Sequence, residues 1–142
     1  MKRKSNTILW ILLSSVAILI IGFGILSFKN YIKSENELRP EFALLKEKGQ
    51  SYTIPECRDH VLTWFKNCQA MKKLCEVSVI KLMNLCLLQK NRHSECLGYE
   101  SQLKKINFGF EECQDKEKDL QRACADIYHS IYDYCNHSLS KR

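Results

Sequence analysis

The chain has 142 residues, with 22 Lys and Arg, 16 Asp and Glu, and eight Cys, which is enough for one small domain. Three basic residues and no acid lie in the first 28 positions, so residues 29–142 carry 19 basic and 16 acidic groups. This balance argues against nucleic-acid binding, and two Pro and five Gly exclude collagen-like and low-complexity classes. The composition indicates a membrane-anchored, cysteine-rich, all-α protein.

Residues 8–28 form an uncharged, mostly apolar stretch, ILWILLSSVAILIIGFGILSF. At ~1.5 Å per residue, a helix of this length crosses a hydrocarbon core of about 30 Å. Lys2, Arg3 and Lys4 precede it, which predicts a cytoplasmic tail at residues 1–7 and an extracytoplasmic C-terminal domain. The alternative is a cleaved signal peptide, whose apolar stretch is usually about 7–15 residues long. The greater length favours an uncleaved signal-anchor helix.

Residues 29–52 are polar and charged, and we expect them to form a solvated stalk. Within it, Pro40 favours a short helix beginning at the next residue, and Gly49 favours its end. Thr53 and Glu56 have the spacing of a capping box. The cysteine-rich helical domain is therefore predicted to occupy residues 53–142.

Apolar or cysteine residues recur every three or four positions from 57 to 86, and the same phase resumes from 113 to 134. This is the spacing of amphipathic helices. It predicts one long helix after Pro55, a connector at 98–109 with room for a helical turn, and a second helix at 110–137. The expected fold is a single transmembrane helix followed by a disulfide-stapled antiparallel helical hairpin or three-helix bundle.

All eight cysteines follow the apolar stretch. An even number on one side of a membrane predicts a disulfide framework in an oxidising space: the periplasm, the secretory lumen or cell surface, or the intermembrane space. In an antiparallel helix pair, opposed residues have a nearly constant sum of residue numbers. A sum of 209 or 210 predicts the pairs Cys75–Cys135, Cys86–Cys124 and Cys96–Cys113.

This register leaves Cys57 and Cys68 without partners in the chain. They are eleven residues apart, or ~16 Å along a continuous helix, so they cannot bond each other there. Three outcomes are open. The helix breaks near residue 70 and its first part folds as a third helix, the two cysteines are free thiols, or they bond their counterparts in a parallel homodimer.

A second register competes, because Cys57 with Cys86 and Cys68 with Cys75 share the sum 143. It describes a tight hairpin of two C-x10-C helices. Residues 57–86 in this form resemble the twin C-x9-C helical hairpins of mitochondrial intermembrane-space assembly proteins. The resemblance implies an assembly factor tethered to the inner membrane. The spacing differs by one residue, however, and the turn at 69–74 consists of helix formers, so the first register is the one predicted.

No motif for chemistry is evident: the sequence lacks CxxC, CxxCH, HExxH, a Gly-rich phosphate loop and Gly-x-Ser-x-Gly. We therefore expect no enzyme activity, no catalytic residue and no cofactor. Cys57 with His60, and His93 with Cys96, have a helical spacing that can hold a metal ion. Oxidation of both cysteines is the favoured interpretation, so no metal site is predicted.

Three tyrosines near the C-terminus, Tyr128, Tyr132 and Tyr134, form a candidate protein-interaction face, since amphipathic aromatics are enriched at interfaces. Partial core packing is the favoured alternative for them. Asn136 begins an Asn-His-Ser glycosylation sequon, which is relevant if this end faces a eukaryotic secretory lumen.

The predicted function is non-enzymatic protein–protein interaction or assembly by a domain anchored in the bilayer. Its protein partner is unidentified, and a homodimer is one option. The alternatives are the intermembrane-space assembly factor and a thiol-redox or metal-handling factor that uses Cys57 and Cys68.

Overall fold

The structure is a computed structural model that describes residues 2–105 and 107–140, with side chains from residue 9 onward. Its regular elements there are all helices, which confirms the all-α expectation. The four long helices are α1 (Lys2–Lys48), α2 (Ile54–Asn67), α3 (Lys72–Leu88) and α7 (Lys118–Ser140). The three short helices are α4 (His93–Leu97), α5 (Glu100–Leu103) and α6 (Phe110–Cys113).

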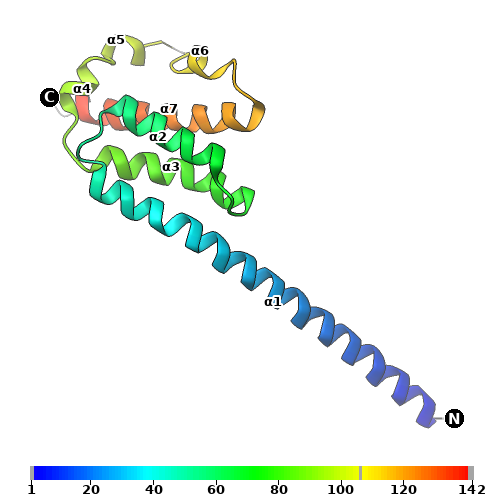
Figure 1. The fold of residues 1–142 in the computed structure, drawn as a ribbon. Coiled ribbons are helices and arrows are strands. Elements are labelled where there is room, and N and C mark those ends of the chain that lie inside the picture. Colours follow the sequence, from blue (N-terminus) through cyan, green and yellow to red (C-terminus); the bar gives the residue numbers. More distant parts are fainter. Residues whose placement is uncertain (1, 106, 141–142) are drawn as a thin grey trace.

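The helices form layers, with α1 on one side and the segment from α4 to α6 on the other (Figure 1). α3 lies in the middle and contacts α1, α2 and α7, while α4 and α6 pack on α7. The N-terminal part of α1 projects away from the domain, and its C-terminal part lies along α3 (Figure 1). The buried core includes Val61, Val79, Leu82, Ile127 and Ile131. α3 contributes most of its length to this core because it has neighbours on three sides.

α1 is the one helix among the described residues that is long and apolar enough to cross a membrane, with a mean hydropathy of 2.6 in its most apolar part. The apolar side chains from Leu9 to Phe28 are exposed. The helix also continues through Pro40, so the prediction of a separate helix beginning at Glu41 is wrong. Proline leaves the carbonyl of Asn36 without its helical donor, and the exposure of both residues lets water take that place.

The expectation of a solvated stalk is wrong for residues 34–49. Ser34, Leu45 and Gly49 are buried, and Phe42 packs against the core. The last three of these residues lie three or four positions apart, and Ser34 lies eight positions before Phe42, so all four share one face of α1, which covers α3. The part of α1 that follows the apolar stretch therefore belongs to the folded domain.

The disulfides are Cys57–Cys86, Cys68–Cys75, Cys96–Cys135 and Cys113–Cys124. The three predicted rungs at Cys75–Cys135, Cys86–Cys124 and Cys96–Cys113 are wrong. Two nested hairpins follow one another along the chain instead, each with an outer and an inner disulfide. The first has the competing register.

The first hairpin forms because the chain turns at residues 68–71, where Cys68 and Met71 have extended backbone. Of the three outcomes for Cys57 and Cys68, the broken helix is the one observed, and α2 is the third helix of the bundle. Both cysteines bond within the chain, so neither is a free thiol and neither can join a second copy. This removes the redox or metal-handling alternative in the form that relied on them.

The second hairpin forms because the predicted helix at 110–137 is interrupted between α6 and α7. Cys113 and Cys124 are eleven residues apart, which would be ~16 Å on a continuous helix, yet their Cα atoms lie 5.7 Å apart. The turn at 114–117 brings them together. At the other end, Cys96–Cys135 attaches α4 to the last turns of α7.

The capping box at the start of α2 is confirmed. The Thr53 N–H donates to the Glu56 carboxylate at 2.6 Å, and the Glu56 N–H donates to the Thr53 hydroxyl at 3.4 Å. The backbone hydrogen bond from Thr53 lowers the pKa of Glu56, and the Thr53 hydroxyl adds to the effect. A charged Glu56 therefore favours the helix start.

Candidate interaction surface

A groove of about 620 Å³ lies between α7 and the connector that contains α5 and the start of α6. Phe108 and Tyr128 belong to its lining, together with exposed Phe110 and Tyr132. The groove is formed against the side of α7 that carries α4 to α6, the layer farthest from α1 (Figure 1). The side of the domain away from the apolar helix thus carries a hollow lined by aromatic side chains.

Gly109 allows the connector to lie directly on α7. Its φ of 78° is the left-handed conformation that favours glycine. A Cβ atom at this position would also lie 2.3 Å from Cγ of Tyr128. Both the backbone conformation and the close approach therefore require glycine here.

Aromatic contacts hold the floor of the groove in place. Phe108 packs edge-on against Tyr128, with ring centroids 5.4 Å apart, and edge-on against Tyr99 at 6.1 Å. On the other side, Arg58 donates a hydrogen bond of 3.0 Å to the Tyr128 hydroxyl. Burial raises the pKa of Tyr128, although Arg58 opposes this, so the phenol stays neutral at physiological pH. The floor is a fixed and largely apolar surface.

The rim of the groove is basic. Lys104, Lys105 and His129 line it beside the exposed rings of Phe110 and Tyr132. Phe110 is 59% exposed, and Tyr132 is also exposed, so both contribute apolar surface to this edge of the groove. Apolar rings beside flexible cations are the composition of a surface that contacts another protein.

The structure separates the three tyrosines of the predicted interaction face. Tyr128 and Tyr132 line the groove, but Tyr134 does not, so the common face is wrong for that residue. Its hydroxyl accepts from the Arg92 N–H at 3.3 Å and donates to the Lys90 carbonyl at 3.2 Å. Tyr128 and Tyr132 are four residues apart and share a side of α7, whereas Tyr134 is two residues after Tyr132 and lies on a different side.

Sequence reasoning missed Phe108 and Phe110, which it treated as part of a connector. The signal that could have found them is a glycine flanked by two phenylalanines in an otherwise polar segment. Asn136 is exposed on α7, and its glycosylation stays a prediction.

The Cys–His pairs do not form a common site. Cys57 and Cys96 are in disulfides. His60 contacts Glu41 of α1, and His93 lies beside Ser138. The described part of the chain holds no group of three or more possible metal ligands.

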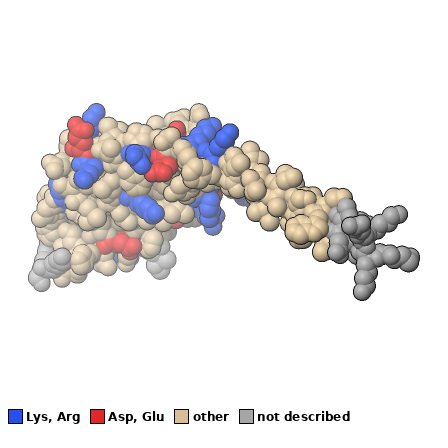
Figure 2. All heavy atoms as spheres, turned by 90° about the horizontal axis from the view of Figure 1, so that it is seen from below, with Lys and Arg blue, Asp and Glu red and all other residues tan. Residues whose placement is uncertain are grey.

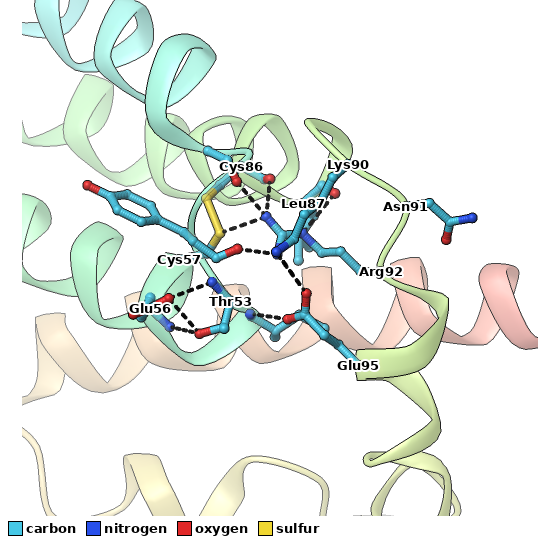
Figure 3. Close-up of polar contacts among 12 residues, drawn as sticks. Thr53, Glu56, Cys57, Cys86, Leu87, Lys90, Asn91, Arg92 and Glu95 are labelled. Atoms are coloured by element: carbon cyan, nitrogen blue, oxygen red, sulfur yellow. Dashed lines mark hydrogen bonds and ion pairs between the residues drawn. A yellow bond between two sulfur atoms is a disulfide. The ribbon is translucent and has the colours of Figure 1, made fainter.

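Arg92 is a third residue that sequence reasoning missed. It lies in a polar segment, Lys90–Asn91–Arg92–His93, that reads as solvated, yet its side chain is fully buried. Its guanidinium donates to the carbonyls of Gly49, Tyr52 and Cys86 at 2.8, 2.6 and 2.9 Å, and Nε donates to Leu87 at 3.1 Å (Figure 3). No local pattern marks it, because Gly49 and Tyr52 lie 43 and 40 residues away in sequence.

These bonds make Arg92 a cap for two helix ends. Cys86 and Leu87 belong to the last turn of α3, and Gly49 follows α1. Carbonyls at helix ends have few backbone donors. The Gln89 N–H donates to Cys86 at 3.4 Å, and Arg92 supplies further donors at both ends. The positive charge also suits the negative ends of the helix dipoles. Glu95 completes the cluster: it pairs with Arg92 at 3.2 Å and accepts from the N–H of Ile54, at the start of α2, at 2.7 Å (Figure 3).

Comparison of the chain with protein-family models, with curated proteins and with solved structures found no match.

Proposed function

We propose that the protein is a non-enzymatic, single-pass membrane protein that binds a protein partner through the aromatic groove on the extracytoplasmic side. The observation that carries the proposal is the hollowed aromatic surface on the side of α7 remote from α1. With α1 in the bilayer, this surface is free to meet a neighbour in the same space.

The chemistry of the groove suggests what its partner presents. A fixed aromatic floor favours an aromatic or aliphatic anchor side chain, because buried aromatic contacts dominate interface energetics. Lys104 and Lys105 on the rim favour acidic residues beside that anchor. We expect a partner segment with one or two apolar anchors next to a carboxylate.

The domain is well suited to present such a surface. Its disulfides constrain both hairpins, and Arg92 connects α1 with α3. Binding to a preorganised surface loses little conformational freedom, which favours affinity. The connection to α1 also means that the membrane helix sets the orientation of the groove.

The choice of compartment is supported by two features. Disulfides persist in oxidising spaces and are rare in reducing ones, and the structure has four of them. The basic residues before the apolar stretch favour a cytoplasmic N-terminus. Protease accessibility of the domain in sealed right-side-out vesicles tests this arrangement, since a protected domain would contradict it.

The groove is tested by crosslinking in membranes that contain the full chain. A photoreactive group at Lys105 should capture a specific partner. The double variant Phe110→Ala/Tyr132→Ala should reduce capture at least tenfold, because it removes both exposed rings. Leu88→Ala/Leu97→Ala, which removes two exposed apolar side chains outside the groove lining, is the matched control. Equal capture by both double variants would contradict the proposal.

A second candidate is an assembly factor of the twin-hairpin type, which the observed pairs Cys57–Cys86 and Cys68–Cys75 favour. These are the two pairs of the competing register, in which residues 57–86 resemble the helical hairpins of the intermembrane-space proteins. The two candidates differ in location. Fractionation of mitochondria, or of the periplasm and envelope, distinguishes them, because only the second requires the space between two mitochondrial membranes.

A further inference from the structure

The turn between α2 and α3 lies next to the point where α1 leaves its apolar stretch. The Met71 N–H in this turn donates to the hydroxyl of Ser34 on α1 at 3.1 Å. Ser34 is six residues beyond Phe28, the last residue of the apolar stretch. At ~1.5 Å per residue, the turn is about 9 Å farther along the helix axis.

This distance places the turn just outside the layer of lipid headgroups if α1 spans the bilayer. The headgroup layer on each side of the hydrocarbon core is roughly 5–7 Å thick. Lysine side chains reach across such gaps, with the stem along apolar surface and the ammonium in the polar layer. The turn is the part of the domain that contacts α1 nearest to the apolar stretch (Figure 1).

Two acid-free stretches meet at this contact. No Asp or Glu occurs among residues 1–34 or 60–75. The first stretch contributes Lys29 and Lys33 from α1, and the second contributes Lys66, Lys72 and Lys73 from the ends of α2 and α3. All five are exposed. Figure 2 shows Lys and Arg side chains gathered where α1 leaves the domain.

Acidic residues lie on one side of the turn, where Asp115, Glu117 and Asp119 line a hollow together with Lys66 and Lys72. Lys72 pairs with Asp119 at 2.7 Å, and Lys73 pairs with Glu76 at 3.1 Å. Both lysine side chains are at least 66% exposed, so these pairs are weak and exchange readily with other anions. Met71, between the lysines and Cys68, is also exposed. An apolar side chain among cations is the composition of a segment at the membrane interface.

We propose that the α2–α3 turn with its flanking helix ends, residues 66–73, binds anionic lipid headgroups of the bilayer that α1 spans. The inference rests on the proposed anchorage by α1 and adds a second membrane contact to it. A contact at the turn, together with the helix, holds the domain at a fixed tilt. The aromatic groove then keeps a constant height above the membrane.

The experiment begins with the intact mass of the membrane-bound protein and its resistance to alkaline extraction. Loss of the first 28 residues would show that the anchorage fails, independently of the turn. The retained full chain is then placed in nanodiscs of phosphatidylcholine, with or without phosphatidylglycerol. Hydrogen exchange of the amides at residues 66–76 reports contact with lipid.

We expect exchange in this segment to slow by roughly fivefold or more when phosphatidylglycerol is present, since each lysine near an anionic surface contributes about fivefold to binding. High salt should abolish the difference. The variant Lys66→Gln/Lys72→Gln/Lys73→Gln should lose it as well. The variant Lys46→Gln/Lys48→Gln/Lys81→Gln, with the same charge change at exposed positions outside the turn, should keep it.

Equal exchange in the two membranes would overturn the proposal for an anchored protein. A lipid effect that survives in the first triple variant would also overturn it, because the lysines would not be its cause. Thermal unfolding of both variants in detergent provides the folding check. A turn variant that unfolds early is replaced by Lys66→Gln alone, which removes no ion pair of the described structure.

Discussion

The guanidinium of Arg92 lies 2.8 Å from the carbonyl oxygen of Gly49, and this contact connects the end of α1 with the middle of the domain. The same nitrogen donates to Cys86 at 2.9 Å. One side chain therefore donates to carbonyls at the ends of both α1 and α3. These two carbonyls, of Gly49 and Cys86, are 37 residues apart in the sequence. The orientation of the domain relative to α1 follows from a buried hydrogen-bond cluster.

Replacing Arg92 by leucine should destabilise the protein by about 3–5 kcal/mol, since several buried carbonyls would lose their donor. Arg92→Lys should recover only part of this, because an ammonium cannot reach all the carbonyls that the planar guanidinium joins. Chemical denaturation of the oxidised chain measures both. Arg122→Leu on the exposed side of α7 is the control. A stable Arg92→Leu protein would show that the cluster contributes little.

Gly109→Ala should cost about 1–3 kcal/mol, because alanine disfavours the left-handed backbone and its Cβ would press on the Tyr128 ring. The connector should move away from α7, so crosslinking to a partner at the groove should also fall. Gly98→Ala is the comparison, since Gly98 has a helical conformation with φ of −63°. Similar losses of stability in the two variants would argue against the close approach at Gly109.

Disulfide removal should affect the two hairpins unequally. In the chain-entropy description, stabilisation grows with the length of the closed loop. Loops of 7 and 39 residues, at Cys68–Cys75 and Cys96–Cys135, correspond to about 2 and about 4 kcal/mol. Paired serine variants compared by denaturation test this order. A larger loss for the shorter loop would indicate that local packing outweighs chain entropy.

Limited reduction should open Cys68–Cys75 first, because Cys68 is the one cysteine that is only partly buried. Differential alkylation followed by peptide mapping identifies the order of opening, and the same map of the untreated protein checks all four pairs. Earlier labelling of Cys57 or Cys86 would contradict the burial of that bond.

Glu56→Gln should weaken the pH dependence of the free energy of unfolding at acidic pH. The pKa of Glu56 is lowered in the folded state by its hydrogen bonds to Thr53. The charged carboxylate therefore contributes stability above its unfolded pKa of about 4.5, and this contribution is lost as the pH falls through the lower folded value. Unfolding of both proteins between neutral and acidic pH measures the difference. Parallel curves would show that the capping box adds no pH dependence, and Glu37→Gln, an exposed change on α1, is the control.

Some features follow from local sequence alone. The apolar stretch to Phe28, the capping box at Thr53 and Glu56, and the helical phase of the cysteines each depend on residues within a few turns of one another. Those patterns predicted an all-α, disulfide-bonded protein with one apolar helix, and the structure agrees.

Other features depend on where the chain turns. Residues 69–74 are helix formers, so propensity favoured a continuous helix and the wrong cysteine register. Tertiary contacts override helix propensity at this turn, because α2 packs on both α3 and α7. Because the chain turns there, Cys57 bonds Cys86, and Cys86 is not available to Cys124 of α7.

The sequence by itself determined the helix type, the apolar segment and the need for disulfides, because each is set by short-range periodicity and composition. Only the tertiary structure decided the pairing of the cysteines, the burial of Arg92 and the groove at Gly109 and Tyr128. These features join residues that are far apart along the chain. Their contact depends on the packing of all the helices together, and no local pattern encodes it.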